Sequence, residues 1–301
     1  MNIDDVKKVL ILGSGTMGQQ IGFQCALHGY DVFLYDIDEG VFEKARGRLA
    51  RIAATLIRRE KISREDADAA ISRITMTADA EEAARDADMV SESVPEDPSL
   101  KGKVFARFNE LCPPRTIFTT NTSTLVPSMF AQATGRPEQF AALHFHDIRT
   151  NNIVDIMPHE TTAPETVTLI EAFARRIGQV PLILHREQHG YIFNTMLSSL
   201  FGAALTLASN GVASVEDIDR SWMGIMNAPL GPFGIMDQIG LSTVWMVCEY
   251  WSKENNDPQS QKNADYLKPY VEKGDLGAKS GKGFYEYPNA TYRQPEFLNP
   301  Q

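Results

Sequence analysis

Short apolar runs alternate with helical patterns through the first 186 residues of this chain. The runs are rich in β-branched and aromatic side chains, which is typical of buried strands. They lie at residues 8–12, 32–35, 73–76, 89–94, 117–120, 140–145, 153–157 and 180–184. Between them apolar residues recur at helical spacing, as at Leu100, Val104, Phe108 and Leu111. This alternation predicts an α/β fold with a doubly wound, mostly parallel sheet.

Helical patterns alone continue from Gly190 onward. The stretch between Glu187 and Glu216 has no formal charge apart from possible protonation of His189, but Asn, Ser and Thr side chains interrupt it. Such a composition favours a helix buried in protein over one in lipid. We therefore expect an α/β domain over residues 1–186 and an all-α domain over residues 187–301. Within the first domain, the charged residues 41–72 are expected to form an inserted helical hairpin.

A glycine-rich turn follows the first apolar run directly, in the order Gly13-Ser14-Gly15-Thr16-Met17-Gly18. In such a turn the first glycine permits a tight bend, the second lets amides approach a pyrophosphate, and the third lets the helix pack closely. The next apolar run ends at Asp36, whose carboxylate can accept the ribose hydroxyls of NAD and would repel the extra phosphate of NADP. The pattern predicts a Rossmann-like NAD site. An ordinary strand-turn-helix joint with a surface carboxylate is the alternative.

Composition limits the partners of the chain. The 301 residues include 43% hydrophobic and 23% charged residues, as in ordinary globular proteins. The net charge of −10 argues against nucleic acid or an anionic membrane, although a local basic patch can still receive an anionic substrate. The three cysteines (Cys25, Cys112 and Cys248) are too far apart for a disulfide framework or a zinc knuckle. With no signal-peptide pattern at the start, these features predict a cytoplasmic protein.

His144 is the best placed of the six histidines for acid–base chemistry, because it lies at the carboxyl end of a predicted strand. Oxidising an alcohol requires a base near the hydroxyl, and imidazole suits that role near neutral pH. Asp155 lies within the next apolar run, where an unpaired carboxylate would be costly. We expect a pair in which Asp155 holds the tautomer of His144. The alternative is that both residues are structural.

Several further motifs follow in order along the chain. They comprise Glu92–Glu96 with Lys101, Asn121–Leu125, Leu143–Phe145, Gly190–Asn194, Gly231–Phe233 with Asp237, and Gly281–Tyr285. On these motifs and the glycine turn, the chain resembles the short two-domain form of the 3-hydroxyacyl-CoA dehydrogenase family over nearly its whole length. The resemblance implies NAD-dependent interconversion of a 3-hydroxyacyl-CoA and a 3-ketoacyl-CoA, a reaction of fatty acid metabolism.

The resemblance also implies roles for individual residues. His144 corresponds to the catalytic base, Asp155 stands where the family carries its paired Glu, Ser123 would bind the substrate oxygen, and Asn194 would supply an amide from the helical domain. The substrate would then lie between the domains. Contacts on the cofactor side are implied for Glu96, Lys101 and Asn121, and the CoA nucleotide would meet Lys44, Arg48 and Arg51 of the insertion. A merely solvated basic helix face is the alternative for these three cations. A homodimer through the helical domain is also implied.

The chain departs from the family pattern after Phe145. The family continues with another aromatic residue and an Asn-Pro pair, whereas this chain has His146–Asn152 in a loop one residue shorter, followed by the shorter acid Asp155. His189 and Thr195 replace an expected Pro and Arg. These changes lie at the acyl end of the site, so they affect the identity of the substrate more than the reaction type.

Three other functions are consistent with parts of the sequence. The first is an NAD-dependent dehydrogenase of a free 3-hydroxy acid, similar to L-gulonate 3-dehydrogenase or lambda-crystallin, which would not need the basic hairpin. The second is a zinc hydrolase whose ligands come from His144, His146, Asp147, Asp155 and His159. The third is a non-catalytic NAD-binding protein. The nucleotide motif disfavours the hydrolase and the four catalytic candidates disfavour the non-catalytic protein, so we expect no resident metal.

Overall fold

A computed structural model describes residues 1–299 of the chain. The chain forms two compact units, Met1–Ile192 and Phe193–Gln301. Each unit is described by itself below.

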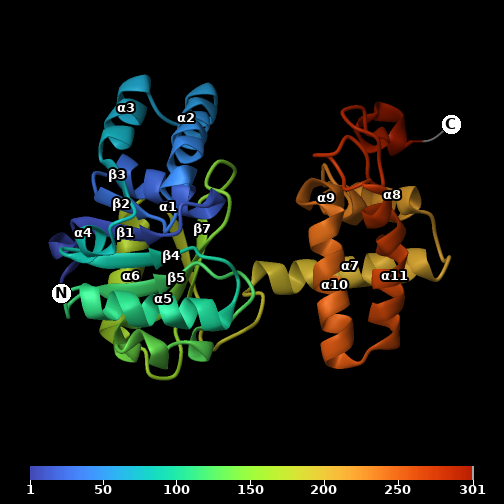
Figure 1. The fold of residues 1–301 in the computed structure, drawn as a ribbon. Helices are drawn as coiled ribbons and strands as arrows, with labels where there is room; N and C mark the ends of the chain where they lie inside the picture. Colours follow the sequence, from blue (N-terminus) through green and yellow to red (C-terminus); the bar gives the residue numbers. More distant parts are fainter. Residues whose placement is uncertain (300–301) are drawn as a thin grey trace. The chain divides into compact units, whose positions relative to one another are not determined.

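The first unit is built on one eight-stranded sheet (Figure 1). Its strands are β1 Lys8–Leu12, β2 Asp31–Tyr35, β3 Ile74–Thr77, β4 Met89–Glu92, β5 Ile117–Thr120, β6 Phe140–Phe145, β7 Ile153–Met157 and β8 Val180–Ile183. The spatial order is β3-β2-β1-β4-β5-β6-β7-β8. Neighbouring strands pair in parallel except β6 and β7, which are antiparallel. The predicted mostly parallel sheet is confirmed, with strand boundaries within one or two residues of those expected.

Helices cover both faces of this sheet. They are α1 Thr16–Leu27, α2 Phe42–Arg58, α3 Arg64–Ser72, α4 Ala80–Ala84, α5 Pro98–Leu111 and α6 Pro164–Arg176. Side chains of β1 alternate between the two cores, because Val9 and Ile11 pack with α1 and α6 while Leu10 and Leu12 pack with α4 and α5. The sheet is therefore doubly wound, as the sequence predicts.

The inserted hairpin is present as helices α2 and α3 (Figure 1). Ser63 begins α3 by accepting a hydrogen bond from the amide of Asp66. In α5 the predicted apolar face is confirmed in part, because Phe108 is buried and Val104 and Leu111 are partly buried against the same core. The buried side chains are Lys101, Phe105 and Phe108, whereas Leu100 is exposed.

The second unit is helical, as predicted. It contains α7 Phe193–Ser209, α8 Val215–Met226, α9 Pro232–Ile239, α10 Leu241–Asn255 and α11 Pro258–Lys273. Helix α7 is the uncharged stretch of the sequence, and it is only partly buried, because its buried residues are Phe201, Ala204 and Leu205. Among the described residues, no helix combines the length and apolar character needed to cross a membrane.

Candidate active site

The glycine turn after β1 has the geometry that a bound pyrophosphate requires. Gly13 has φ +100°, and a Cβ on it would lie 2.7 Å from the carbonyl oxygen of Ser93. A Cβ on Gly18 would overlap the carbonyl oxygen of Gly13, so only glycine lets α1 pack this closely. A Cβ on Gly15 would meet nothing within 4 Å. The turn therefore leaves open space beside Gly15, at the N-terminus of α1, where an anion is favoured.

Asp36 is connected directly to this turn. Its Oδ2 atom accepts hydrogen bonds from the amide (2.9 Å) and hydroxyl (2.8 Å) of Ser14. The half-buried carboxylate thus lies at the end of β2 beside the glycine turn, where a ribose would follow the pyrophosphate. The residues present fit NAD.

A buried ion network supports the loop that follows β5. The ammonium of Lys101, which is 1% exposed, lies 2.6 Å from Glu92 Oε1 and 3.2 Å from Glu96 Oε2. Glu96 Oε1 accepts hydrogen bonds from the amides of Ser123 (3.0 Å) and Thr124 (3.1 Å). Burial alone would raise the pKa of Glu96, but Lys101 and the hydrogen-bond donors of residues 122–124 hold that pKa below its usual value. Glu96 therefore shapes the loop that carries Ser123, and its predicted contact with the cofactor, like that of Lys101, stays a prediction.

Asn121 joins the ends of two neighbouring strands. Its backbone amide donates to the carbonyl of Glu92 (2.8 Å), and its side-chain Oδ1 accepts from the amide of Phe145 (2.7 Å). Because β5 and β6 run in parallel, these bonds keep the residues after β5 and the end of β6 at the same edge of the sheet. Its contact with NAD stays a prediction.

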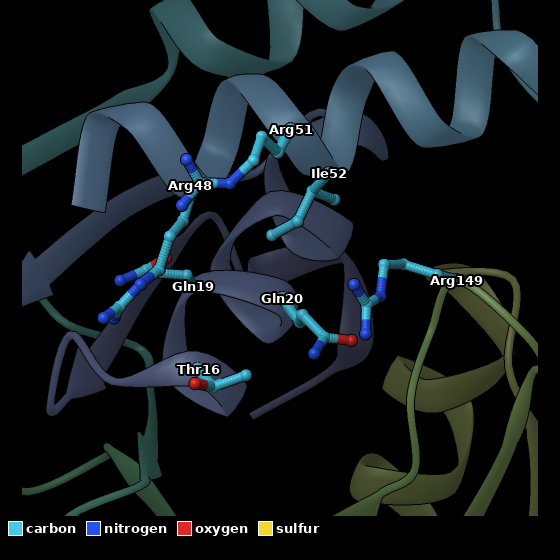
Figure 2. Close-up of a pocket in the computed structure, with 7 residues that line it drawn as sticks. All are labelled: Thr16, Gln19, Gln20, Arg48, Arg51, Ile52 and Arg149. Carbon is cyan, nitrogen blue, oxygen red and sulfur yellow. The ribbon is translucent and has the colours of Figure 1, made fainter. Parts of the chain in front are cut away.

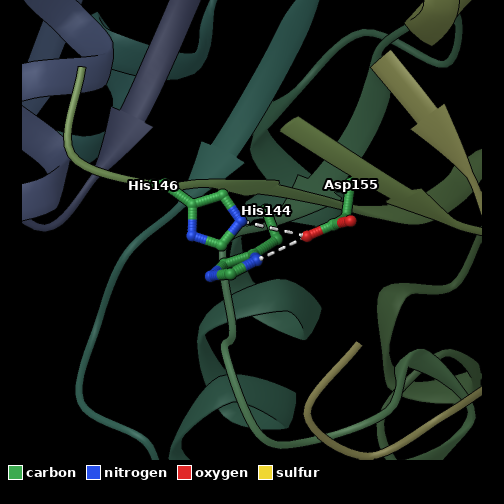
Figure 3. Close-up of side chains that lie close together, drawn as sticks. All are labelled: His144, His146 and Asp155. Carbon is green, nitrogen blue, oxygen red and sulfur yellow. Dashed lines mark hydrogen bonds and ion pairs between the residues drawn. The ribbon is translucent and has the colours of Figure 1, made fainter. Parts of the chain in front are cut away.

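The structure brings the predicted pair of His144 and Asp155 together. The two residues lie opposite each other in the antiparallel strands β6 and β7, and His144 Nδ1 is 3.2 Å from Asp155 Oδ2. His146 Nε2 lies 3.3 Å from the same oxygen (Figure 3). From the sequence, His146 was predicted only as one of the possible zinc ligands. The alternation His144-Phe145-His146 indicates that both imidazole rings lie on the same face of the strand.

Burial and hydrogen bonding set the ionisation of this pair. Burial lowers the pKa of His144 below its ordinary value, although the hydrogen bond that it donates to Asp155 opposes that effect. Burial would raise the pKa of Asp155, but hydrogen bonds from His144 and His146 hold it below its usual range. An ionised Asp155 beside Nδ1 favours the tautomer that carries its proton there, which leaves His144 Nε2 as a proton acceptor. The ring of Tyr191 packs against His144 with centroids 4.6 Å apart.

Cations of α2 surround two hollows on the first unit. One is a cavity of about 100 Å³, lined by Thr16, Gln19, Gln20, Arg48, Arg51, Ile52 and Arg149 (Figure 2). The second is lined by Glu43, Lys44, Gly47, Arg48 and Arg51. The three cations named from the sequence therefore share one surface.

Arg149 is a cavity residue that the sequence reasoning missed. It comes from the loop between β6 and β7, which is held to α1 by a hydrogen bond from the amide of Ile148 to Gln20 (3.1 Å). Its backbone carbonyl also accepts from Arg59, the residue that follows α2. The guanidinium pairs with Asp147 at 2.8 Å. The only signal for this position was the departure of the loop from the family pattern.

Two residues of the possible metal set have partners away from His144 and Asp155. Asp147 pairs with Arg149, and His159 Nε2 lies 3.0 Å from the carbonyl of Pro137. Of the five candidate zinc ligands, His144, His146 and Asp155 lie close together, whereas Asp147 and His159 have other partners. Asn194 lies in α7 of the second unit, so its predicted role toward the substrate stays a prediction.

The doubly wound sheet, the dinucleotide turn and the histidine–carboxylate pair at the sheet's edge together define a nicotinamide-dependent dehydrogenase. Residues 8–188 match the 3-hydroxyacyl-CoA dehydrogenase NAD binding domain, and residues 190–287 match the 3-hydroxyacyl-CoA dehydrogenase C-terminal domain. The chain belongs to the 3-hydroxyacyl-CoA dehydrogenase family.

Individual relatives differ in the substrate for which they are named. A probable 3-hydroxybutyryl-CoA dehydrogenase of Bacillus subtilis is 30% identical over 288 residues, which cover 95% of this chain and 99% of the relative. The solved (S)-3-hydroxybutyryl-CoA dehydrogenase of Ralstonia eutropha is 29% identical, with a TM-score of 0.84 and coverage of 94% and 99%. A solved diketoreductase that acts on dicarbonyl compounds is 38% identical, with a TM-score of 0.87 and the same coverage. Family membership therefore leaves the substrate open.

Proposed function

We propose that this enzyme interconverts a 3-hydroxyacyl-CoA and a 3-ketoacyl-CoA with NAD. The observation that carries the proposal is the buried His144–Asp155 pair at the end of β6, in the same unit as the glycine turn and the basic surface of α2. That unit combines a base, a dinucleotide turn and cations suited to phosphates.

His144 Nε2 accepts the proton of the C3 hydroxyl group during oxidation. Asp155, hydrogen-bonded to Nδ1, stabilises the imidazolium that forms and keeps the ring in the correct orientation. Bound NAD supplies the acceptor for the hydride that leaves C3. In the reductive direction the imidazolium returns the proton to the new alcohol.

Ser123 is proposed to donate a hydrogen bond to the reacting oxygen, where negative charge develops. Its backbone is held by Glu96, so the loop is organised by the protein before substrate arrives. The amide of Asn194, the homodimer through the second unit and a cytoplasmic location are retained as predictions. Exposed apolar side chains on the second unit, such as Ile225 (81%) and Tyr250 (57%), support the homodimer.

The proposed CoA site is the basic surface of α2. Lys44, Arg48 and Arg51 line one hollow, and Arg149 joins the two arginines around the neighbouring cavity. In a chain with a net charge of −10, this concentration of cations favours a phosphorylated ligand. Guanidinium groups bind phosphate oxygens through charge-assisted hydrogen bonds.

Oxidation of a free 3-hydroxy acid, or reduction of a free dicarbonyl compound, is the second candidate. It is favoured by the 38% identity to the diketoreductase and by the unusual loop that carries His146 and Arg149. A small carboxylate could bind Arg149 without using α2.

The two candidates are distinguished by measuring loss of NADH absorbance with acetoacetyl-CoA, free acetoacetate and a neutral diketone. We expect turnover of the CoA ester, and we expect the double variant Arg48→Gln/Arg51→Gln to raise its KM by about tenfold or more through lost phosphate contacts. Arg46→Gln changes an exposed cation of the same helix outside both hollows and should leave KM unchanged. Turnover of the free compounds alone would contradict the proposal.

A further inference from the structure

Three potential metal ligands converge at the end of β6 (Figure 3). Asp155 Oδ2 lies 3.2 Å from His144 Nδ1 and 3.3 Å from His146 Nε2, and the three atoms all lie within 4.8 Å of one another. The two imidazole rings meet edge to face, with centroids 4.6 Å apart. Two imidazole nitrogens and one carboxylate oxygen form a ligand set that is typical of zinc sites with an open position.

The spacing of these atoms matches a tetrahedral centre. Bonds of about 2.0–2.2 Å from zinc to nitrogen or oxygen place neighbouring ligands roughly 3.3–3.5 Å apart in a tetrahedron. Hydrogen bonds from imidazole to an ionised carboxylate are normally shorter, about 2.7–2.9 Å. The observed distances from Asp155 Oδ2 to the two imidazole nitrogens, 3.2 and 3.3 Å, are closer to the separation of two zinc ligands than to the length of such a hydrogen bond.

The carboxylate itself provides a second, independent observation. Asp155 is 1% exposed, and its Oδ1 atom is buried without a hydrogen-bond partner among the described residues. A buried carboxylate with an unsatisfied oxygen is costly, and a bound cation would compensate its charge. His146 is less buried, with 19% of its side chain exposed, so it lies on the solvent side of the cluster.

We propose that His144, His146 and Asp155 form a Zn²⁺ site that reversibly inactivates the catalytic base. The fourth position of the tetrahedron would hold water. Nitrogen ligands favour Zn²⁺ over Mg²⁺ and Ca²⁺, which prefer all-oxygen sites. The ion is an inhibitor in this proposal and takes no part in the dehydrogenation.

Inhibition follows from the proton positions on His144, and this step rests on the proposed function. Without metal, Nδ1 carries the ring proton toward Asp155, and Nε2 has the lone pair that accepts the substrate proton. Zinc binds through the lone pair of Nδ1, so the ring proton of neutral His144 is then on Nε2. Nε2 can no longer act as a base, and Asp155, now a zinc ligand, no longer stabilises an imidazolium.

The test measures zinc binding directly, in the full-length protein freed of metal by a chelator and of any purification tag. Equilibrium dialysis against Zn²⁺ should give one ion per chain, and Co²⁺ in its place should give the intense visible absorption of a four-coordinate site. His146→Phe keeps a ring of similar size but removes one ligand, so we expect zinc affinity to fall by at least about 100-fold. The matched control His185→Phe replaces an exposed histidine and should bind zinc like the parent protein.

Binding is measured without substrate, so its outcome is independent of the substrate proposal. NAD binding by His146→Phe checks that the variant is folded. If the variant does not fold, the Co²⁺ spectrum of the parent protein shows by itself whether a four-coordinate site exists. Saturating Zn²⁺ should abolish oxidation while saturating Mg²⁺ should not. Absence of stoichiometric zinc, equal zinc affinity of His146→Phe, or full activity of the zinc-saturated enzyme would each overturn the proposal.

Discussion

Asp155 lies directly opposite His144 in the antiparallel strands β6 and β7, and its Oδ2 atom is 3.2 Å from Nδ1 of the imidazole. Directly opposite residues in such a pair point their side chains to the same face. The sheet itself therefore positions the proposed base and its carboxylate, without help from a loop. The resemblance implies that Asp155 stands where the family carries a Glu, and in this chain strand register rather than side-chain length brings the two groups together.

The first prediction concerns the base. His144→Asn removes the proton acceptor but keeps a polar side chain at the end of β6. We expect kcat for alcohol oxidation to fall by roughly 10²–10⁴-fold, the usual contribution of a general base. Binding of NADH, followed by its fluorescence, should be unchanged because the glycine turn is on β1 and α1. Activity equal to that of the parent enzyme would remove His144 from the mechanism.

The second prediction concerns cofactor choice. Asp36→Arg replaces the carboxylate beside the ribose with a cation that can bind the 2′-phosphate of NADP. We expect the ratio of kcat/KM for NAD to that for NADP to fall by about 10²-fold or more. Asp38→Arg introduces the same charge two residues further on and is the matched control. A ratio that does not change in Asp36→Arg would exclude the ribose contact.

The third prediction separates two glycines of the same turn. Gly18→Ala would force a methyl group onto the carbonyl oxygen of Gly13, so we expect a loss of about 1–3 kcal/mol in stability. A methyl on Gly15 would project into open space, so Gly15→Ala should fold normally and lose NADH affinity by about tenfold or more. Thermal unfolding and NADH titration of both variants provide the measurements. Unchanged NADH affinity in Gly15→Ala would mean that no phosphate lies there.

The strands were predictable because each is a compact apolar run. The dinucleotide turn was predictable because each of its glycines is required for a different steric reason. The burial of Lys101 in α5 was not predictable. A lysine counts as polar in any hydrophobic periodicity, and this one is buried through its contacts with Glu92 and Glu96. The three residues are close together in the sequence, but hydrophobic periodicity does not show that their charges meet at a buried position.

The same limit applies to the active site. The pairing of His144 with Asp155 could be anticipated, because an isolated acid in a buried strand needs a partner. The position of Arg149 could not be anticipated, because it depends on how the loop after β6 packs near α1 and the end of α2.

The fourth prediction tests the buried ion network. Lys101→Met keeps an unbranched side chain of similar length but leaves the fully buried carboxylate of Glu92 without its cation. Breaking a buried pair on one side costs about 3–5 kcal/mol. Denaturation followed by circular dichroism should show this loss, and Lys103→Met, an exposed position of the same helix, should show almost none. Equal stability of the two variants would mean that the network does not stabilise the fold.

The last prediction concerns a buried carboxylate in the second unit. Asp219 accepts hydrogen bonds from the amides of Phe233 (2.8 Å) and Gly234 (2.9 Å) and from the hydroxyl of Tyr285 (2.9 Å). Burial nevertheless raises its pKa to about 6, against an ordinary value of 3.8. The folded state therefore binds the proton more tightly than the unfolded chain, so the stability that this group contributes is complete below pH 3.8 and is lost as the pH rises to about 6.

Asp219→Asn removes this titration. The amide nitrogen cannot accept the bonds from Gly234 and Tyr285 that one carboxylate oxygen accepts, so the variant should be less stable by about 1–3 kcal/mol at low pH. The stability difference between variant and parent should shrink by about 2.4 kcal/mol between pH 4 and pH 7, because a pKa difference is worth about 1.4 kcal/mol for each unit. All three tryptophans (Trp222, Trp245 and Trp251) lie in the second unit, so their fluorescence during urea denaturation reports on this unit. A stability difference between variant and parent that is constant with pH would show that Asp219 is already ionised at pH 4 in the folded protein.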